Sequence, residues 1–336
     1  MRPPEFWKAE VSGRDSALVL RALLTPVSWL YAAVASHRIR TTTSRHAPAS
    51  IICVGNLTVG GAGKTPISRA LRAKLGPHAH TLSRGYGGRA IGPLRVTPDM
   101  EAVEVGDEPL LHARDGAAWV ARDRYAGALA AAQAGARVII MDDGFQNPSL
   151  AKDLCIVAVD PAYGVGNGQV FPAGPLRERL RDGLARADAI VMLHNTWSED
   201  TPERPDWLIN FDKPVLQAAV SPTGEAPRGP LVAFAGLARP EKFFDTLEAV
   251  GADLAETVPY PDHHPYSEDD LTWLTQLAGE RSAQLITTEK DAARLTPHWR
   301  ERVAVLPVAA RFADEAALDA LLAPIVSRIT AAHGEA

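Results

Sequence analysis

At 336 residues the chain is long enough for one large domain or two domains of ordinary size. Hydrophobic residues make up 46% of it and charged residues 22%, which excludes a disordered, collagen-like or multi-span membrane protein. The net charge is -5, yet residues 1–50 hold seven Lys/Arg against three Asp/Glu. A basic leading segment on an acidic body does not suit a nucleic-acid-binding protein, but it suits an anionic membrane surface.

The leading segment, residues 1–40, predicts an amphipathic helical arm. Apolar residues recur there at the spacing of one helix face: Leu20, Leu23, Leu24, Val27, Leu30, Tyr31 and Val34. Thr25 and Pro26 divide this pattern. Because Thr can cap a helix that begins with Pro, we expect two helices, at about 14–24 and 26–37.

The uncharged stretch 22–36 of this arm is 15 residues long, shorter than the roughly 20 needed to cross a bilayer. Trp7, Trp29 and Tyr31 supply rings suited to the lipid headgroup layer. The arm could therefore lie on a membrane surface, or it could pack on the protein's own core. Its acidic residues and the break at Pro26 argue against a cleaved signal peptide.

A glycine-rich loop, GNLTVGGAGKT at residues 55–65, stands between the apolar run 51–54 and a helical stretch at 66–75. The backbone N–H groups of such a loop and the following helix start bind nucleotide phosphates. Lys64 can reach the β- and γ-phosphates, and the Thr65 hydroxyl can bind Mg²⁺. Thr58 occupies the position where the usual motif has its first Gly. We predict that ATP is bound by Thr58, Val59, Gly60, Gly61, Ala62, Gly63, Lys64 and Thr65.

A second apolar run, 137–141, is followed by Asp142, Asp143 and, after two residues, Gln146. Carboxylates at the end of a buried strand, after a phosphate loop, are the expected second contact of a Mg²⁺ ion. Adjacent acids repel each other unless a cation lies beside them. An exposed Asp-Gly turn is the alternative. Gln146 could orient a phosphate oxygen or a water, or be a surface amide.

The segment 103–109, VEVGDEP, predicts a strand ending in an acidic turn before a helix that starts near residue 110. Asp107 would then lie on the same rim as the phosphate loop, where it could accept a proton from an attacking hydroxyl. The alternative is that Asp107 and Glu108 only complement the helix dipole.

Ser83 and Arg84 begin a flexible loop, SRGYGG, that we place beside the same rim. An Arg in such a loop can pair with phosphate, and the glycines can let the loop close. The same composition also describes a solvent-exposed turn.

Strands and helices alternate again after residue 150, which predicts a second α/β lobe with a parallel sheet. The strands are expected at 154–159, 189–193, 215–220, 231–235 and 285–287. We therefore predict an α/β protein with a P-loop NTPase-like parallel-sheet domain at 41–150 and an α/β/α domain at 151–336. The nucleotide would bind the first domain and the acceptor would bind the cleft between them.

Three segments of this second half could serve a site. The loop 167–178 ends in Arg177 and Glu178 at a helix start and could recognise phosphate, or it could be a solvated helix face. The turn 261–266, PDHHPY, holds His263, which could tune a carboxylate base, while neighbouring ligands for a metal are lacking. The turn 287–291, TTEKD, is charged and ends another strand.

These motifs together resemble one family, the tetraacyldisaccharide 4'-kinases of lipid A synthesis. The resemblance runs from about residue 7 to about residue 311. It rests on the ordered set VGNLTVGGAGKTP, LSRGYGG, VGDEP, DDGFQ, GNG followed by FPAGPLRE, PDHHPY and ITTEKDAARL.

The resemblance implies transfer of the ATP γ-phosphoryl group to the 4'-hydroxyl of tetraacyldisaccharide 1-phosphate, at the cytoplasmic face of the bacterial inner membrane. It implies ATP and Mg²⁺, a peripheral monomer bound to the membrane surface, and no nucleic-acid partner. The roles it suggests are Asp107 as base with His263 as its partner, Lys64 on phosphate, and a metal site at Thr65, Asp142 and Asp143. Active-site neighbours would be Ser83, Arg84, Glu108, Gln146, Arg177 and Glu178.

The main alternative is a P-loop nucleotide switch, such as a metallochaperone GTPase. Those proteins commonly carry a second Lys early in the loop, where this chain has Val59, and a guanine-reading N-K-x-D is not evident. A membrane scaffold that uses ATP only structurally would leave the turns at Asp107 and His263 without a role.

Overall fold

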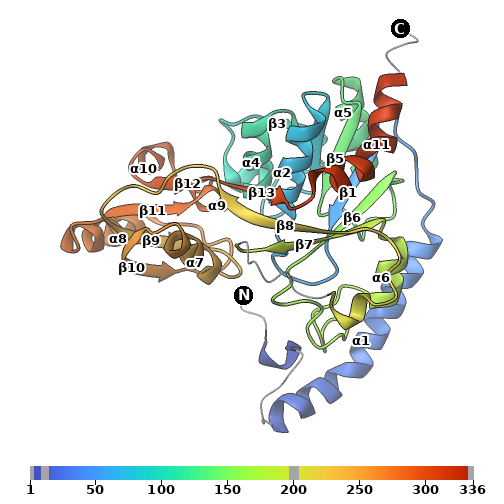
Figure 1. The fold of residues 1–336 in the computed structure, drawn as a ribbon, viewed down its shortest axis with the longest axis horizontal. Coiled ribbons are helices and arrows are strands. Elements are labelled where there is room, and N and C mark those ends of the chain that lie inside the picture. Colours follow the sequence, from blue (N-terminus) through green and yellow to red (C-terminus); the bar gives the residue numbers. More distant parts are fainter. Residues whose placement is uncertain (1–3, 9–14, 197–203, 332–336) are drawn as a thin grey trace.

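Two β-sheets organise the chain in the computed structural model, which describes residues 4–8, 15–196 and 204–331 (Figure 1). The large sheet has nine described strands in the order β13-β8-β7-β6-β1-β5-β2-β4-β3. The pairs β13–β8 and β3–β4 are antiparallel and the other neighbours are parallel. In chain order these strands are β1 (Ser50–Gly55), β2 (Ala79–Ser83), β3 (Leu94–Val96), β4 (Ala118–Val120), β5 (Val138–Asp142), β6 (Leu154–Val159), β7 (Ala189–His194), β8 (Val215–Pro222) and β13 (Val308–Phe312).

Helices cover both faces of the large sheet because its central strands are apolar on both sides. In β1, Ile51 and Cys53 face a core that α5 and α6 cover, whereas Ile52 and Val54 face a core that α2 and α11 cover. The helices of this lobe are α2 (Lys64–Leu75), α3 (Ala102–Val105), α4 (Asp107–Asp115), α5 (Arg124–Gln133), α6 (Leu180–Arg186) and α11 (Glu315–Ala331), with a short 3-10 helix η2 (Asp206–Leu208).

A smaller lobe extends to one side of the large sheet (Figure 1). Its four described strands run parallel in the order β10-β9-β11-β12. Helix α8 packs on one face of this sheet and α7 on the other. The elements are β9 (Pro230–Ala235), α7 (Glu241–Ala249), β10 (Asp253–Pro259), α8 (Glu268–Glu280), β11 (Gln284–Thr288), α9 (Glu289–Ala292), α10 (Pro297–Arg300) and β12 (Ala304–Leu306).

The α/β class with two lobes is confirmed, but the expected boundary at residue 150 does not separate the two sheets. Strand β6 pairs in parallel with β1, so the chain after residue 150 first completes the large sheet. The small lobe is an insertion between β8 and β13, at residues 223–307. A hydrophobic pattern shows where strands lie but not which strands pair with one another. The predicted domain boundary at residue 150 was therefore too early in the chain.

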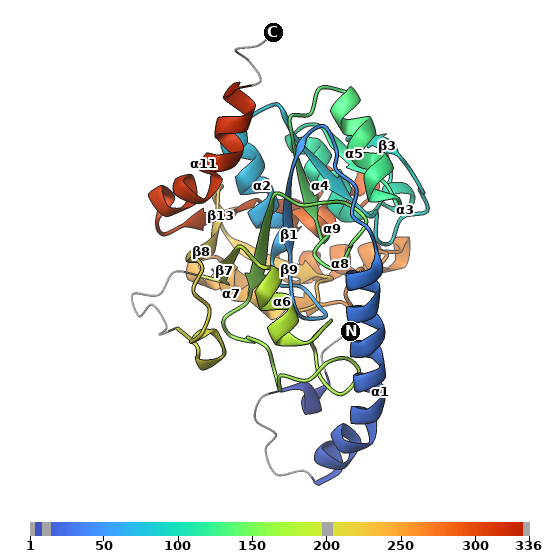
Figure 2. The same cartoon turned by 90° about the vertical axis from the view of Figure 1, so that its right-hand side faces the viewer.

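The arm is one helix, α1 (Asp15–Thr41), preceded by the 3-10 helix η1 (Glu5–Trp7), and not two helices as expected. Pro26 lies inside it, and the Thr25 hydroxyl donates to the Arg21 carbonyl at 2.8 Å instead of capping a new helix. Figure 2 shows α1 as a rod along the outside of the body.

By length and composition alone, the 25 residues Ala17–Thr41 could cross a membrane, although only 15 of them, 22–36, form an uncharged stretch. Most of the expected apolar face is exposed; Leu23 and Leu30, for example, are 69% and 67% exposed. Leu23 and Leu30 therefore do not pack on the protein's own core.

Another local prediction was wrong at residues 103–105, which lie in the short helix α3 and not in a strand. The remaining strand predictions of both lobes are confirmed within one or two residues at each end.

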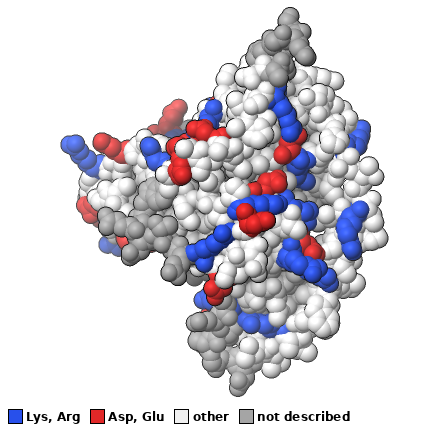
Figure 3. Space-filling view, turned by 45° about the vertical axis from the view of Figure 1, so that its right-hand side comes forward, with Lys and Arg blue, Asp and Glu red and all other residues white. Residues whose placement is uncertain are grey.

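On the face shown in Figure 3, basic and acidic side chains are interspersed.

Candidate active site

The glycine-rich loop follows β1 and runs into α2, as predicted. Gly63 is the residue before the helix and has a left-handed φ of 74°. A Cβ added there would lie 2.1 Å from a methyl carbon of Leu193, so conformation and space both require Gly. All the residues predicted to bind ATP, from Thr58 to Thr65, lie in this turn and the first turn of α2. The loop and helix start can thus present backbone N–H groups to an anion.

Asn56, which the sequence analysis missed, holds the first half of the loop in place. Its buried amide donates to the carbonyls of Thr58 and Gly60 at 2.7 and 3.2 Å. Its position directly after the strand, before a loop that needs internal support, is the signal that could have identified it.

Asp142 lies beside this loop because β5 pairs in parallel with β1, with Val54 opposite Asp142. Its Oδ2 is 3.2 Å from the Thr65 hydroxyl oxygen and 2.8 Å from Nε2 of His112. Its Oδ1 is buried without a hydrogen-bond partner among the described residues. His112 was not predicted as a site residue, because it stands within an apolar helical run of α4.

Asp143 turns away from Asp142, with a left-handed φ of 53°. Its carboxylate is 3.6 Å from Lys64 Nζ and 2.8 Å from Arg177 Nη1. Burial would raise the pKa of Asp143, but Lys64 and Arg177 together hold it below its ordinary value. The two adjacent acids are therefore accommodated by different partners.

Gln146, Arg177 and Glu178 form one connected group next to Asp143. The Gln146 amide donates to Glu178 at 3.0 Å and accepts from Arg177 at 3.3 Å. Glu178 is buried, and Arg186, which was not predicted, donates to both of its oxygens at 2.6 and 2.8 Å. The hypothesis of a solvated helix face is thereby excluded for Glu178, since a buried carboxylate needs such a partner.

Asp107 and His263 meet although 156 residues separate them: Asp107 Oδ2 is 3.0 Å from His263 Nδ1. Asp107 is the first residue of α4 and only 4% exposed. Arg294, which the sequence analysis left unassigned, also donates to its Oδ2 at 3.0 Å. Burial would raise the pKa of Asp107, but His263, Lys290 and Arg294 keep it well below its ordinary value.

Glu108 pairs with Lys290 of α9 at 2.9 Å, so it too connects the lobes. Burial alone would lower the pKa of Lys290, whereas Glu108 and Asp107 raise it above its ordinary value. Lys290 belongs to the charged turn 287–291 noted in the sequence, and Arg294 follows it within the motif ITTEKDAARL.

Ser83 ends β2 and is buried, and its Oγ has no hydrogen-bond partner among the described residues. Arg84 is exposed at the start of the following loop. Within that loop the Tyr86 ring lies 5.6 Å from the His263 ring, centroid to centroid. The loop after β2 therefore reaches the Asp107–His263 pair, at the edge where the carboxyl ends of β1, β2 and β5 meet.

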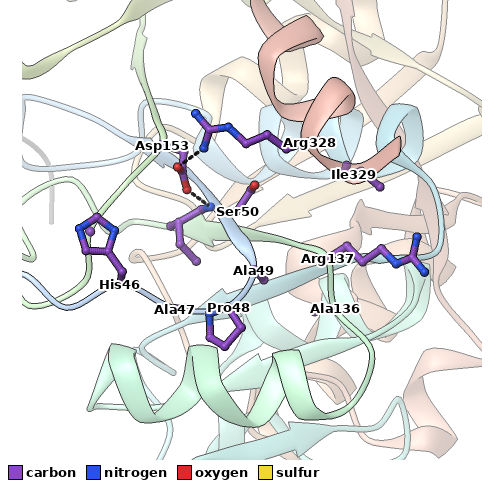
Figure 4. A pocket seen from close by; sticks show the side chains of 12 residues that line it. His46, Ala47, Pro48, Ala49, Ser50, Ala136, Arg137, Asp153, Arg328 and Ile329 are labelled. Atoms are coloured by element: carbon purple, nitrogen blue, oxygen red, sulfur yellow. Dashed lines mark hydrogen bonds and ion pairs between the residues drawn. The ribbon is translucent and has the colours of Figure 1, made fainter. Parts of the chain in front are cut away.

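A pocket of about 390 Å³ lies at the opposite edge of the sheet, at the amino ends of β1 and β5 (Figure 4). There Asp153 accepts from the Ile51 N–H at 2.8 Å and pairs with Arg328 of α11. It contains none of the predicted site residues, so the candidate active site is the rim and not this pocket.

A family model described as tetraacyldisaccharide-1-P 4'-kinase matches residues 20–327. Relatives named tetraacyldisaccharide 4'-kinase from Maricaulis maris (strain MCS10) and Phenylobacterium zucineum (strain HLK1) are 48% and 51% identical to it. These alignments cover 100% and 95% of this chain, and 100% and 98% of the relatives.

A solved structure is also similar: LpxK from Aquifex aeolicus in complex with ATP, with a TM-score of 0.75 and 30% identity. The likeness covers 91% of this chain and 99% of that one. With a family match over most of its length and relatives near half identity, the chain belongs to the tetraacyldisaccharide-1-P 4'-kinase family.

Proposed function

We propose that this protein is an ATP-dependent kinase that phosphorylates the 4'-hydroxyl of tetraacyldisaccharide 1-phosphate. The observation that carries the proposal is the placement of the phosphate loop and the Asp107–His263 pair at one rim. The family relatives, each named as a 4'-kinase, supply the identity of the acceptor. None of the matches described above is named as a nucleotide switch, so that alternative has no support.

Phosphoryl transfer asks a protein mainly for positioning and for neutralisation of charge. Lys64 and the backbone N–H groups of the loop would hold the β- and γ-phosphates of ATP. Arg177 is anchored by Asp143 at 2.8 Å, so its guanidinium is fixed beside Lys64, which Asp143 also contacts. Gln146 and Glu178 would keep this Arg in place, and Ser83 and Arg84 would border the acceptor side.

Asp107 would accept the proton of the 4'-hydroxyl as the new P–O bond forms. It is ionised at neutral pH, because its pKa is held low by His263, Lys290 and Arg294. Hydrogen bonds from His263 and Arg294 fix the carboxylate in one orientation. Glu108 would assist indirectly, by holding Lys290 near Asp107.

The residues near the phosphate loop also fit a Mg²⁺ ion. Thr65 and Asp142 offer hard oxygen donors, and Asp142 Oδ1 is buried and unpaired within the described part of the chain. No group of three or more His, Cys, Asp or Glu is arranged for a metal among those residues. A Mg²⁺ ion bound to nucleotide needs only one or two protein ligands, and it would neutralise phosphate charge. Asp143, also predicted as a metal ligand, pairs with Lys64 and Arg177 instead, and would act by holding these two side chains in place.

The membrane surface is the proposed meeting place of enzyme and acceptor. A lipid with four acyl chains leaves a bilayer only at a cost of about 0.8 kcal/mol per CH₂. The exposed apolar side chains of α1 could bind that surface, with the basic residues near them favouring anionic lipid. We place the protein, as a monomer, at the cytoplasmic face of the bacterial inner membrane, without a nucleic-acid partner.

Transfer of labelled phosphate from ATP to detergent-dispersed tetraacyldisaccharide 1-phosphate tests the proposal. Label should appear on the glycolipid, and ATP consumption should depend on this acceptor. Hydrolysis that is independent of acceptor would favour a nucleotide switch and overturn the proposal.

Lys64→Ala should lower turnover at least a hundredfold, because it removes a charge that stabilises the transition state. Circular dichroism is expected to show an intact fold, since Asp143, the ion-pair partner of Lys64, keeps its second partner Arg177 at 2.8 Å. Turnover near that of the unmodified protein would exclude the phosphate role of Lys64.

A further inference from the structure

One side of α1 is bonded into the body through a buried hydroxyl. Ser28 is 3% exposed, whereas its neighbours Val27 and Trp29 are 52% and 67% exposed. The Ser28 Oγ accepts a hydrogen bond from the Ala173 N–H at 2.9 Å. A buried polar group on a largely exposed helix marks a specific contact, because an unpaired one is costly.

Ala173 belongs to a loop, residues 167–177, that contacts the arm at further points. The Trp7 indole donates to the Pro172 carbonyl at 2.9 Å. The Phe171 ring lies 6.0 Å from the Trp7 ring and 5.6 Å from the Tyr31 ring, in edge-to-face arrangements. This end of the loop is therefore fixed to η1 and α1 together.

The other end of the same loop is fixed to the phosphate loop. Residues 57–59 lie antiparallel to residues 175–177, with a β-bridge between Thr58 and Leu176. Two backbone hydrogen bonds complete this pairing: Val59 N–H to the Pro175 carbonyl at 2.7 Å, and Arg177 N–H to the Leu57 carbonyl at 2.8 Å.

Only Gly174 separates the residue bonded to the arm from the residue bonded to the phosphate loop. A Cβ added to Gly174 would lie 2.2 Å from both the Asn167 Oδ1 and the Gln169 carbonyl oxygen. The turn is thus tightly packed, and a shift of Ala173 cannot be absorbed there without moving Pro175.

We infer that residues 167–177 form a strap that makes α1 part of the scaffold of the nucleotide site, with Ser28 as a positioning residue. This inference rests on the proposed function in that it requires a nucleotide on the phosphate loop. It assigns the two sides of α1 to different tasks. The Ser28 side sets the backbone of residues 57–59, and the exposed side is left for contact with lipid.

Ser28→Ala tests the strap, and Ser36→Ala is its matched control. Ser36 lies on the same helix and donates to Asp182 at 3.2 Å, outside the strap. Calorimetry with Mg²⁺ and a non-hydrolysable ATP analogue, without lipid, should show affinity reduced about fivefold or more by Ser28→Ala. Ser36→Ala should leave the affinity unchanged. Ser28→Thr, which keeps the hydroxyl, should bind the analogue as tightly as the unmodified protein does.

Steady-state kinetics give a second readout. Ser28→Ala should raise the KM for ATP and leave the KM for the acceptor unchanged, which a general loss of stability would not do. Equal effects of Ser28→Ala and Ser36→Ala, or none from either, would overturn the strap while the kinase assignment stands. If the unmodified protein binds no nucleotide, the proposed function itself fails.

Hydrogen exchange on the unmodified protein avoids variants that fold poorly. Coupling between two sites is reciprocal, so the nucleotide must stabilise the arm contact as much as the arm stabilises nucleotide binding. The analogue should slow exchange in residues 167–177 and at the Ser28 turn of α1. Exchange there that is unaffected by bound analogue would overturn the inference.

Discussion

Asp107 is both the proposed catalytic base and a carboxylate whose pKa is set by neighbouring charges. Its neighbours Arg294, Lys290 and His263 all belong to the small lobe, whereas Asp107 begins a helix of the large lobe. The low pKa of the carboxylate therefore depends on contact between the lobes. A depressed pKa makes Asp107 a weaker base but keeps it deprotonated, and fixed orientation compensates for lost basicity.

The pH dependence of His263→Ala tests this view of the base. A hydrogen bond from His263 lowers the pKa of Asp107, so its removal should raise that pKa. Asp107 must be ionised to act, and the acidic limb of kcat/KM should therefore move to higher pH. His264→Ala is the control, because His264 pairs with Asp270 and not with Asp107. If the acidic limb lies at the same pH in both variants, His263 does not influence the pKa of the catalytic base.

His112 is a second residue whose role is positional. A carboxylate only accepts hydrogen bonds, so His112 Nε2 donates to Asp142 at 2.8 Å, within the buried interior. That bond directs one oxygen of Asp142 toward Thr65 and leaves the other available. His112→Leu should weaken Mg²⁺ binding about tenfold, as loss of a ligand's supporting hydrogen bond commonly does.

The Mg²⁺ affinity of His112→Leu can be measured without turnover, by titrating Mg²⁺ into the protein in the presence of a fluorescent ADP analogue. His112→Gln keeps a donor and should recover most of the affinity. His80→Leu is the control, since His80 is also buried but pairs with Trp119. Equal Mg²⁺ affinity in His112→Leu and the unmodified protein would show that Asp142 needs no such support.

At the scale of elements, Arg69 joins the helix that follows the phosphate loop to both lobes. From α2 it donates to Asp115 at the end of α4, at 2.6 and 3.1 Å. It also donates to Glu289 at the start of α9, at 2.9 and 3.1 Å. Glu289 in turn accepts from the Val308 N–H, where the chain re-enters the large sheet. One guanidinium therefore fixes the small lobe relative to the phosphate site.

Removing this guanidinium should loosen the junction between the lobes. Arg69→Met should reduce the free energy of unfolding by about 1–2 kcal/mol, because the ion pairs are only partly buried. Arg69→Lys should not restore it, since one ammonium cannot pair with both carboxylates in this bidentate manner. Urea unfolding monitored by tryptophan fluorescence measures both variants. A midpoint unchanged in Arg69→Met would mean that these ion pairs add nothing to stability.

Over the whole molecule, the sequence predicted what depends on local pattern. The strand, glycine loop and helix around Lys64 were predictable because turn chemistry and strand ends are local properties. The extent of the first sheet was not, since strand order depends on long-range pairing such as β6 on β1. Arg294 and His112 were missed for a related reason. A single Arg or His carries no signal until the fold places it against a carboxylate.

The exposed side of the arm gives the molecule a surface for lipid, and its contribution can be measured. Leu30 is 67% exposed on α1, and Leu30→Ser removes apolar area without affecting the Ser28 contact. Cosedimentation with anionic phospholipid vesicles should show binding weakened by about tenfold, from a loss of about 1.4 kcal/mol. Trp273→Ser is the matched control, because Trp273 is 49% exposed on α8 of the small lobe. If both variants bind vesicles as the unmodified protein does, lipid contact does not involve this face, and the acceptor must be reached in another way.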